Sequence, residues 1–126
     1  MSEKDKKGIN PKTYKSDHVK NVILIGAGAT GEFICRELLS DKKHQMNPIG
    51  FLDDNESLNH IEIHGQPVLG NIEELPELVL EYDESLICCP KATRNEMRRI
   101  INLCKESGKP FRTLPSVTEL VTGNVS

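Results

Sequence analysis

An unbroken apolar run that ends in three glycines constrains this chain more than any other feature. Residues 21–31 read NVILIGAGATG, with Gly26, Gly28 and Gly31 at the spacing G-x-G-x-x-G. The apolar part is typical of a strand buried on both faces of a parallel sheet. Apolar side chains then recur at helical spacing, which predicts a helix over residues 29–40. The stretch therefore predicts a strand, a tight turn and a helix in direct succession.

Length and charge exclude several classes of protein. The 126 residues suffice for one domain with one core. Sixteen basic and 19 acidic residues give a net charge of -3, and no basic patch is interleaved with aromatic residues, so we expect no nucleic acid partner. No apolar stretch approaches the roughly 20 residues that span a bilayer, and the N-terminus lacks the apolar segment of a signal peptide. We therefore expect a cytoplasmic protein.

The N-terminal residues differ in composition from the rest of the chain. Residues 1–20 are rich in charge and carry few apolar side chains, so burial cannot offset the entropy lost on ordering. They are interpreted as a flexible leader. Residues 21–126 are then the folded module.

Strand and helix patterns alternate through this module. After the first helix we expect a strand at 48–54, a hairpin or extended loop at 60–70, a helical segment at 71–82 interrupted by a proline, a strand at 85–90, an amphipathic helix at 92–108, a strand at 109–115 and a short helix from 116 onward. This alternation predicts a single α/β domain with a doubly wound, mainly parallel sheet.

The glycine turn is suited to binding a nucleotide. Gly26 permits the tight turn, Gly28 has no side chain to block a pyrophosphate, and Gly31 lets the helix pack close to the strand. The free amides and the positive end of the helix dipole would face the phosphates. Thr30 is unusual in such a turn, because its branched side chain would either crowd a phosphate or donate a hydrogen bond to it. The candidate residues here are Gly26, Ala27, Gly28, Ala29, Thr30 and Gly31.

An acidic residue at the end of the second strand would complete a dinucleotide site, because its carboxylate accepts hydrogen bonds from ribose hydroxyls. Asp53 is at the expected position. Asp54 beside it is also a candidate, but it is better interpreted as a turn-forming residue, because aspartate is common in turns. Pro90, Lys91, Ala92 and Thr93 lie at the end of the third strand, at the sheet edge where ligands of such folds bind, and are further candidates for ligand contact. Because Asp53 would repel a 2′-phosphate, NAD is the preferred cofactor, with a UDP-sugar or CoA as alternatives. The other reading is a strand-to-helix turn without a ligand.

The four cysteines are Cys35, Cys88, Cys89 and Cys104. They have no C-x-x-C spacing, and three lie in apolar segments, so we interpret them as reduced, buried thiols. A nucleophile or redox pair is the alternative, but no histidine lies near any of them in sequence.

Two other groups of side chains invite a functional interpretation. His60 and His64 are four residues apart, but their segment is not helical in pattern and lacks a third ligand, so we predict solvated histidines and no metal site. Arg94, Arg98 and Arg99 are interpreted as the solvent-facing side of their helix.

Several segments together resemble one protein family over nearly all of residues 20–126. They are VILIGAGATGEFICRELL, PIGFLDDN, IHGQPVLGNIEELPEL, LICCPKATRNEMRRIINLCKESG and FRTLPSVTELVTGNVS. These resemble the N-terminal module of bacterial polysaccharide biosynthesis proteins of the CapD type, which are nucleoside-diphosphate-sugar epimerases and dehydratases. The resemblance implies a Rossmann-like, nucleotide-binding module related to CoA-binding domains.

The same resemblance implies that catalysis and membrane attachment belong to other segments. Family members carry an N-terminal membrane region and a separate short-chain dehydrogenase domain that acts on a UDP-sugar with bound NAD. The second glycine-rich motif and the Tyr-x-x-x-Lys pair of that domain have no counterpart here, since neither Tyr14 nor Tyr82 is followed by a lysine four residues later. We therefore assign no catalytic residue, and expect association with the cytoplasmic face of the membrane only through segments outside this chain.

Two alternatives stay open. The N-terminal domain of sugar-nucleotide acetyltransferases has similar G-A-G-x-x-G, G-F-L-D-D and P-V-L-G segments and binds the nucleotide-sugar substrate. The chain could instead be a structural module with a vestigial site that forms a homo-oligomer through an apolar helix face.

Overall fold

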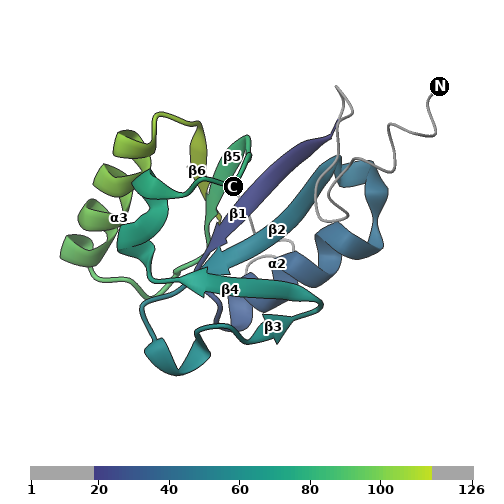
Figure 1. The fold of residues 1–126 in the computed structure, drawn as a ribbon, viewed down its shortest axis with the longest axis horizontal. Helices are drawn as coiled ribbons and strands as arrows, with labels where there is room; N and C mark the ends of the chain where they lie inside the picture. The colour runs from purple at the N-terminus through teal and green to yellow at the C-terminus, as the bar shows by residue number, and fades with distance from the viewer. Residues whose placement is uncertain (1–18, 115–126) are drawn as a thin grey trace.

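The computed structural model describes residues 19–114. Within them, six strands form one sheet in the order β3-β4-β2-β1-β5-β6 (Figure 1). The strands are β1 (Lys20–Ile25), β2 (Met46–Leu52), β3 (Glu62–Ile63), β4 (Gln66–Gly70), β5 (Glu84–Ile87) and β6 (Phe111–Thr113). Neighbouring strands are parallel except β3 and β4, which are antiparallel. The predicted mainly parallel sheet is confirmed.

Helices cover both faces of this sheet. The α-helices of the described residues are α2 (Ala29–Ser40) and α3 (Arg94–Ser107), and the short 3₁₀ helices are η1 (Lys42–His44), η2 (Glu56–Leu58) and η3 (Ile72–Glu77). Figure 1 shows α2 on one side of the sheet and α3, with η3 beside it, on the other. The fold is therefore the doubly wound, Rossmann-like arrangement that the sequence predicted.

Strand β1 lies at the centre and contributes to two cores. Its residues Val22 and Leu24 pack on the α2 side of the sheet, whereas Ile23 and Ile25 pack on the α3 side. All four are fully buried. Burial on both faces explains why this strand is continuously apolar in sequence and does not alternate with polar residues.

The glycine turn brings α2 into direct contact with the end of β1. Gly26 has φ +109°, and a Cβ atom there would lie 2.6 Å from the carbonyl oxygen of Cys88. A Cβ on Gly31 would overlap the carbonyl oxygen of Gly26. Only hydrogen fits at either position, so the close packing predicted for Gly31 is confirmed.

The middle of the chain departs from regular structure where the sequence indicated. Strands β3 and β4 form the predicted hairpin, with His64 and Gly65 both at positive φ in its two-residue turn. The predicted helical segment at 71–82 forms only the 3₁₀ helix η3, which contains Pro76 and ends at Glu77. Proline cannot donate the backbone hydrogen bond that a longer α-helix would require, so the second predicted turn does not form.

Helix α3 begins and ends where the sequence predicts. Thr93 and Glu96 form a reciprocal capping box at its start, and Gly108 ends it in the left-handed conformation at φ +76°. Ile100 and Cys104 are buried on its inner side, and Met97 and Ile101 are partly buried. The amphipathic helix is therefore confirmed.

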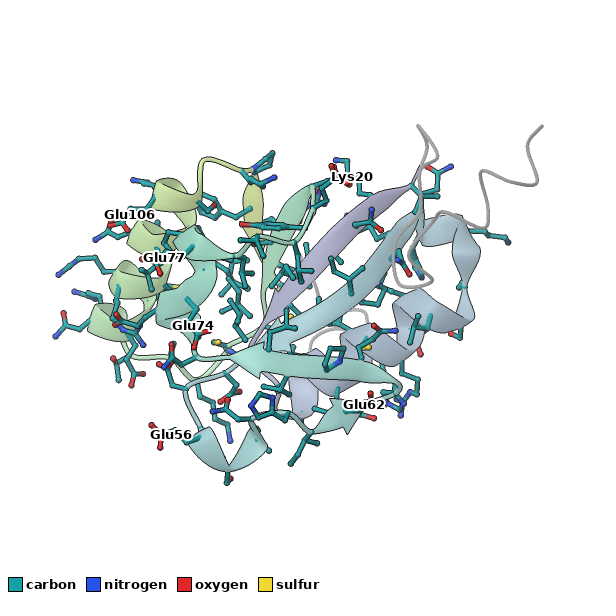
Figure 2. The ribbon with its side chains drawn as sticks, in the orientation of Figure 1. Lys20, Glu56, Glu62, Glu74, Glu77 and Glu106 are labelled. Atoms are coloured by element: carbon teal, nitrogen blue, oxygen red, sulfur yellow. The ribbon has the colours of Figure 1, made fainter. Side chains whose placement is uncertain are left out.

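A charged cluster joins three strands at the amino end of the sheet. Glu84 at the start of β5 is 3% exposed and binds both Lys20 and Arg112. Burial alone would raise the pKa of Glu84, but the hydrogen bonds and charges of Arg112 and Lys20 outweigh it and lower the pKa. Figure 2 shows Lys20 far from Glu56, which follows β2 at the opposite edge.

The predicted leader, apart from residues 19 and 20, lies outside the described residues, and so does the predicted helix from 116 onward. None of the helices within 19–114 is long and apolar enough to cross a membrane.

We predict that Gly31→Ala lowers the free energy of unfolding by more than about 2 kcal/mol, because the added methyl group overlaps the Gly26 carbonyl. Alanine's better helix propensity offsets only about 1 kcal/mol of this cost. Gly28→Ala is the matched control, since a Cβ there meets nothing within 4 Å and should change stability by less than about 1 kcal/mol. Urea unfolding measures both. Equal stability of the two variants would contradict the packing argument.

Candidate functional site

A cavity of about 420 Å³ opens at the carboxyl ends of β1, β2 and β5. This is the edge at which ligands of open α/β sheets bind, and the volume falls in the usual range for small-molecule sites. The cavity is lined by Gly26, Gly28, Ala29, Thr30, Asp53, Asp54, Ile72, Cys88, Cys89, Pro90, Lys91, Ala92, Glu96, Arg99 and Ile100.

Most of the residues predicted from the sequence line this cavity. Three of the predicted residues, Ala27, Gly31 and Thr93, do not. Ala27 is 8% exposed and packs in the core on the α2 side, while Gly31 contacts β1. Ala27 nevertheless takes part through its backbone, as described below. Whether the lining residues bind a nucleotide stays a prediction.

The amino end of α2 faces the cavity without a side-chain cap. Gly28 occupies the N-cap position and has no side chain that could accept from the helix amides. A Cβ on Gly28 would meet nothing within 4 Å, so open space adjoins this residue. The acidic residue of the first turn, Glu32, is bound to Arg36 and His64. The uncapped amides and the helix dipole therefore suit an anion.

Thr30 is buried in the wall of the cavity. It is 4% exposed, in the first turn of α2. Its position at the wall leaves both predicted effects open, namely crowding of a phosphate or a hydrogen bond to it.

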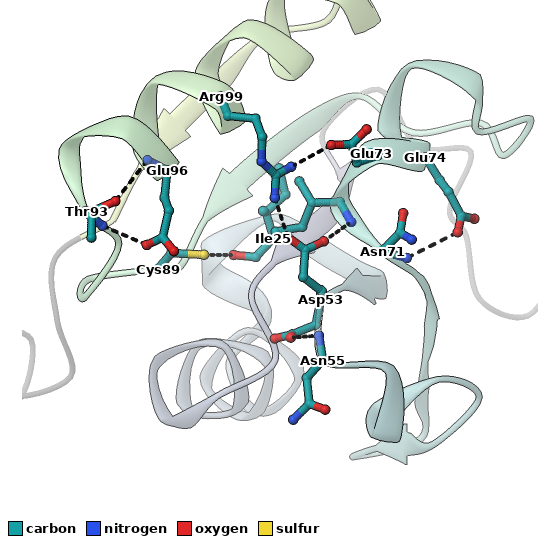
Figure 3. A network of polar contacts seen from close by, with 12 residues as sticks. Ile25, Asp53, Asn55, Asn71, Glu73, Glu74, Cys89, Thr93, Glu96 and Arg99 are labelled. Atoms are coloured by element: carbon teal, nitrogen blue, oxygen red, sulfur yellow. Dashed lines mark hydrogen bonds and ion pairs between the residues drawn. The ribbon is translucent and has the colours of Figure 1, made fainter.

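Asp53 ties the end of β2 to the glycine turn. Its Oδ2 accepts a hydrogen bond from the Ala27 amide at 2.7 Å, and its Oδ1 accepts one from the Asn55 amide at 2.8 Å. Figure 3 shows the bond to Asn55. A carboxylate offers about four acceptor positions, so capacity for a ribose hydroxyl is left. Asp53 thus holds the loop as well as being placed for ligand contact.

Arg99 corrects a prediction. The sequence placed it on the solvent-facing side of α3, but it lines the cavity and its side chain is 37% exposed. Its guanidinium donates to the carboxylate of Asp54 and, at 3.3 Å, to that of Glu73 (Figure 3). Asp54 also accepts from the Ile72 amide at 2.9 Å. Asp54 is therefore more than a turn residue, because it joins the end of β2 to η3 and α3.

The segment after β5 forms the opposite side of the cavity. Lys91 is exposed, and Cys89 is partly buried with its thiol donating to the Ile25 carbonyl at 3.3 Å. Glu96 lines the cavity while capping α3 through the Thr93 amide at 2.8 Å. The amino end of α3 is thus already occupied by a carboxylate, in contrast to that of α2.

All four cysteines have raised pKa values. Burial raises the pKa of Cys35 and Cys104 to about 11 and that of Cys88 to about 12. Burial, assisted by the negative charges of Asp53, Asp54 and Glu96, raises the pKa of Cys89 to about 11. No disulfide joins these four cysteines, all of which lie in the described range. The predicted burial is confirmed for Cys35, Cys88 and Cys104, whereas Cys89 is only partly buried.

The histidines do not form a metal site. His64 at the hairpin turn lies 2.7 Å from a carboxylate oxygen of Glu32 on α2, and His60 is exposed. Among residues 19–114, no three His, Cys, Asp or Glu side chains are placed to hold a metal ion.

Sequence reasoning missed six residues of the cavity wall. They are Ile72, Cys88, Cys89, Glu96, Arg99 and Ile100. For Ile72 a signal existed, because it lies two residues after the end of β4 and so near the carboxyl edge of the sheet. For Arg99 and Ile100 no local signal separates a cavity-facing position from an ordinary one on the helix.

The sequence model of the CoA-binding domain family matches residues 12–115. The chain belongs to this family. Among curated proteins, it is 29% identical over 103 residues to the probable polysaccharide biosynthesis protein EpsC of Bacillus subtilis, covering 80% of this chain and 17% of that protein. It is 25% identical over 109 residues to the capsular polysaccharide biosynthesis protein CapD of Staphylococcus aureus, covering 84% and 18%. The chain thus spans less than a fifth of the length of these relatives.

Solved structures share the fold. UDP-D-quinovosamine 4-dehydrogenase from Vibrio fischeri aligns with a TM-score of 0.74 and 24% identity, over 86% of this chain and 88% of that one. The Rex-family repressor RSP aligns with a TM-score of 0.65 and 20% identity, over 86% and 58%. The same repressor in complex with NADH aligns with a TM-score of 0.63 and 19% identity, over 84% and 58%. At these identities the likeness concerns the fold.

We predict that Asp53→Ala lowers the free energy of unfolding by about 1–3 kcal/mol, because the Ala27 and Asn55 amides both lose their acceptor. Asp53→Asn keeps one carbonyl oxygen and should lose less. Glu56→Ala, an exposed acid in η2, is the control. Thermal and urea unfolding measure all three. An Asp53→Ala variant as stable as the parent would show that the two hydrogen bonds do not hold the loop.

We also predict slow alkylation of the native thiols. With a pKa of about 11, about one Cys89 in a thousand is thiolate at pH 8, and this fraction rises about tenfold per pH unit up to pH 10. Iodoacetamide labelling followed by mass spectrometry should therefore find Cys89 modified first, at a rate far below that of free cysteine. The urea-unfolded chain is the control and should react at all four positions. Fast labelling of native Cys89 at pH 7 would contradict the raised pKa of its thiol.

Proposed function

We propose that this chain is the nucleotide-binding module, of NAD type, of a sugar-nucleotide epimerase or dehydratase that acts in bacterial polysaccharide biosynthesis. The observation that carries the proposal is the uncapped amino end of α2, which opens at Gly28 onto a cavity bounded by Asp53. The EpsC and CapD relatives support the biosynthetic context.

In this proposal each part of a dinucleotide occupies a different part of the cavity. The pyrophosphate lies against the amides of Gly28, Ala29 and Thr30, where the dipole of α2 favours negative charge. Lys91, exposed at the mouth, adds a positive charge on the same side. The ribose lies at Asp53, the acceptor at the end of β2.

An apolar wall completes the site for the base. Ile72 at the start of η3 and Ile100 on α3 both line the cavity, and both belong to the core on that side of the sheet. A flat aromatic base buries apolar area against such side chains, which is favourable by about 25 cal/mol per Å². Recognition of the base through contacts of this kind is loosely selective, so the choice of nucleotide depends more on the ribose and phosphates.

NAD is the preferred ligand over a UDP-sugar or CoA. Asp53 favours an unmodified ribose. The NADH complex of the fold-related repressor is consistent with this choice, although that finding concerns the repressor alone.

The reaction on the sugar is assigned to residues outside this chain. The cavity holds no pair of groups suited to proton or hydride transfer from a sugar. Its three carboxylates, Asp53, Asp54 and Glu96, are bonded to Arg99 or to backbone amides, and of its two cations only Lys91 is exposed. Tyr82, the tyrosine of the described residues, is 4% exposed and lies in the α3-side core. The module binds its nucleotide at the cytoplasmic side of the membrane in this proposal.

Isothermal titration calorimetry of the chain with NAD, NADH, UDP-sugars and CoA tests the proposal. We expect NAD or NADH to bind with an affinity that Gly28→Val lowers at least about tenfold, because the valine side chain occupies the open space at the end of α2. The variant should unfold at the same urea concentration as the parent. No binding by any of these ligands at millimolar concentration would refute the proposal, and preferential binding of UDP-sugars would favour the acetyltransferase-like alternative.

A further inference from the structure

We propose that the ribose end of the cavity selects against a phosphate on the ribose, and so discriminates against CoA and NADP, through a clamp formed by Asp54, Arg99 and Glu73. The inference rests on the proposed function, since it assumes that a nucleotide occupies this cavity. It concerns a residue, Arg99, that the sequence pattern assigned to solvent. It also bears on the ligand, because membership of the CoA-binding domain family leaves the ligand of this chain undecided.

The first step concerns where a ribose phosphate would lie. A ribose held at Asp53 directs its 2′ and 3′ oxygens toward the end of β2, where Asp54 is the next residue and also lines the cavity. Lys91 follows β5, and β1 separates β5 from β2 in the sheet order. The exposed lysine is therefore on the pyrophosphate side and not beside the ribose hydroxyls.

The second step concerns the cation that could accept such a phosphate. Arg99 is the guanidinium that lines the cavity among the described residues. Its Nη2 donates to Asp54 Oδ2 and its Nη1 donates to Glu73 Oε2 at 3.3 Å. Two carboxylates thus compensate one positive charge, and both terminal nitrogens are already engaged. Figure 3 shows Arg99 extending from α3 toward Glu73 and the end of β2.

The third step is the resulting balance of charge. Asp53 and Asp54 line the cavity with Arg99, and Glu73, an exposed residue beside the cavity, pairs with Arg99. Three carboxylates therefore accompany one guanidinium, and a phosphate brought to the ribose position meets net negative charge. Asp54 is also fixed by the Ile72 amide at 2.9 Å, so it cannot easily turn away. A repulsive element of this kind gives specificity by weakening the wrong ligand rather than by strengthening the right one.

Matched ligand pairs test the inference. NAD and NADP differ by a 2′-phosphate, and 3′-dephospho-CoA and CoA differ by a 3′-phosphate. By calorimetry we expect the member without the ribose phosphate to bind at least about tenfold more tightly in each pair, the scale of a like-charge contact in a partly screened site. Equal or tighter binding of NADP and CoA would overturn the inference and leave the proposed function intact. Failure of all four ligands to bind would refute the proposed function itself.

Variants of the clamp test its mechanism. Glu73→Gln and Asp54→Asn, singly and together, remove the negative charges that compensate Arg99 while preserving side-chain shape. The double variant should lower the preference for NAD over NADP, and for dephospho-CoA over CoA, by at least about tenfold. The double variant should bind NADP and CoA more tightly than the parent does, and adding Arg99→Gln should abolish this increase in affinity. A merely structural role of the clamp would not predict that loss.

Two controls separate the clamp from general charge effects. Glu77→Gln removes one exposed negative charge from the same element as Glu73, at a residue that forms no ion pair with Arg99. Glu106→Gln removes one exposed negative charge from the last turn of α3, the helix that carries Arg99, at a residue that does not line the cavity. Both controls should keep the parent ratios within about threefold. Equal effects of Glu77→Gln and Glu73→Gln would contradict a specific role for the clamp.

Discussion

The close contact between Gly31 and the carbonyl of Gly26 fixes the geometry on which the site depends. Because no side chain separates them, α2 packs directly on the end of β1, and its amino end points into the space between β2 and β5. The positive φ of Gly26 provides the turn that this approach requires. The bond from the Ala27 amide to Asp53 then joins this turn to β2. The contact between Gly31 and the Gly26 carbonyl therefore determines both how α2 packs on the sheet and the shape of the cavity.

The two helix termini near the cavity differ in a way that makes one of them the better position for the proposed phosphate. Helix α3 begins with Thr93 and Glu96, which satisfy each other's amides, and the Glu96 carboxylate occupies the site that an anion would take. Helix α2 begins with Gly28, which offers nothing to its amides. Free donors and open space coincide at α2 alone among the α-helices of the described residues, so the proposed phosphate site is supported by the helix caps as much as by the glycine spacing.

Local sequence patterns predicted the fold and about half of the residues that line the cavity. Contacts between segments that are distant in sequence could not be predicted from such patterns. The glycine turn and the amphipathic helix α3 are marked by local sequence, and both were found where predicted. Arg99 was missed because its position depends on contact with Asp54, 45 residues away in sequence. Asp53 was expected to face a ribose, but its bonds to backbone amides appear only when β2 and the turn are placed together. The extent of η3 was overestimated, because helical spacing of apolar residues outweighed Pro76 in the prediction.

The fold and the proposed choice of ligand depend on different residues in this protein. The family match covers residues 12–115, and within them the glycines and the buried strands specify a fold and a glycine turn that proteins with many different nucleotides share. The charged residues at the end of β2 and on η3 and α3 do not contribute to that turn. A related chain with the same glycines could therefore bind another nucleotide if Asp54 or Glu73 were replaced and Arg99 were left free. The ligand of this module is consequently better inferred from the partners of Arg99 than from the glycine pattern or the family.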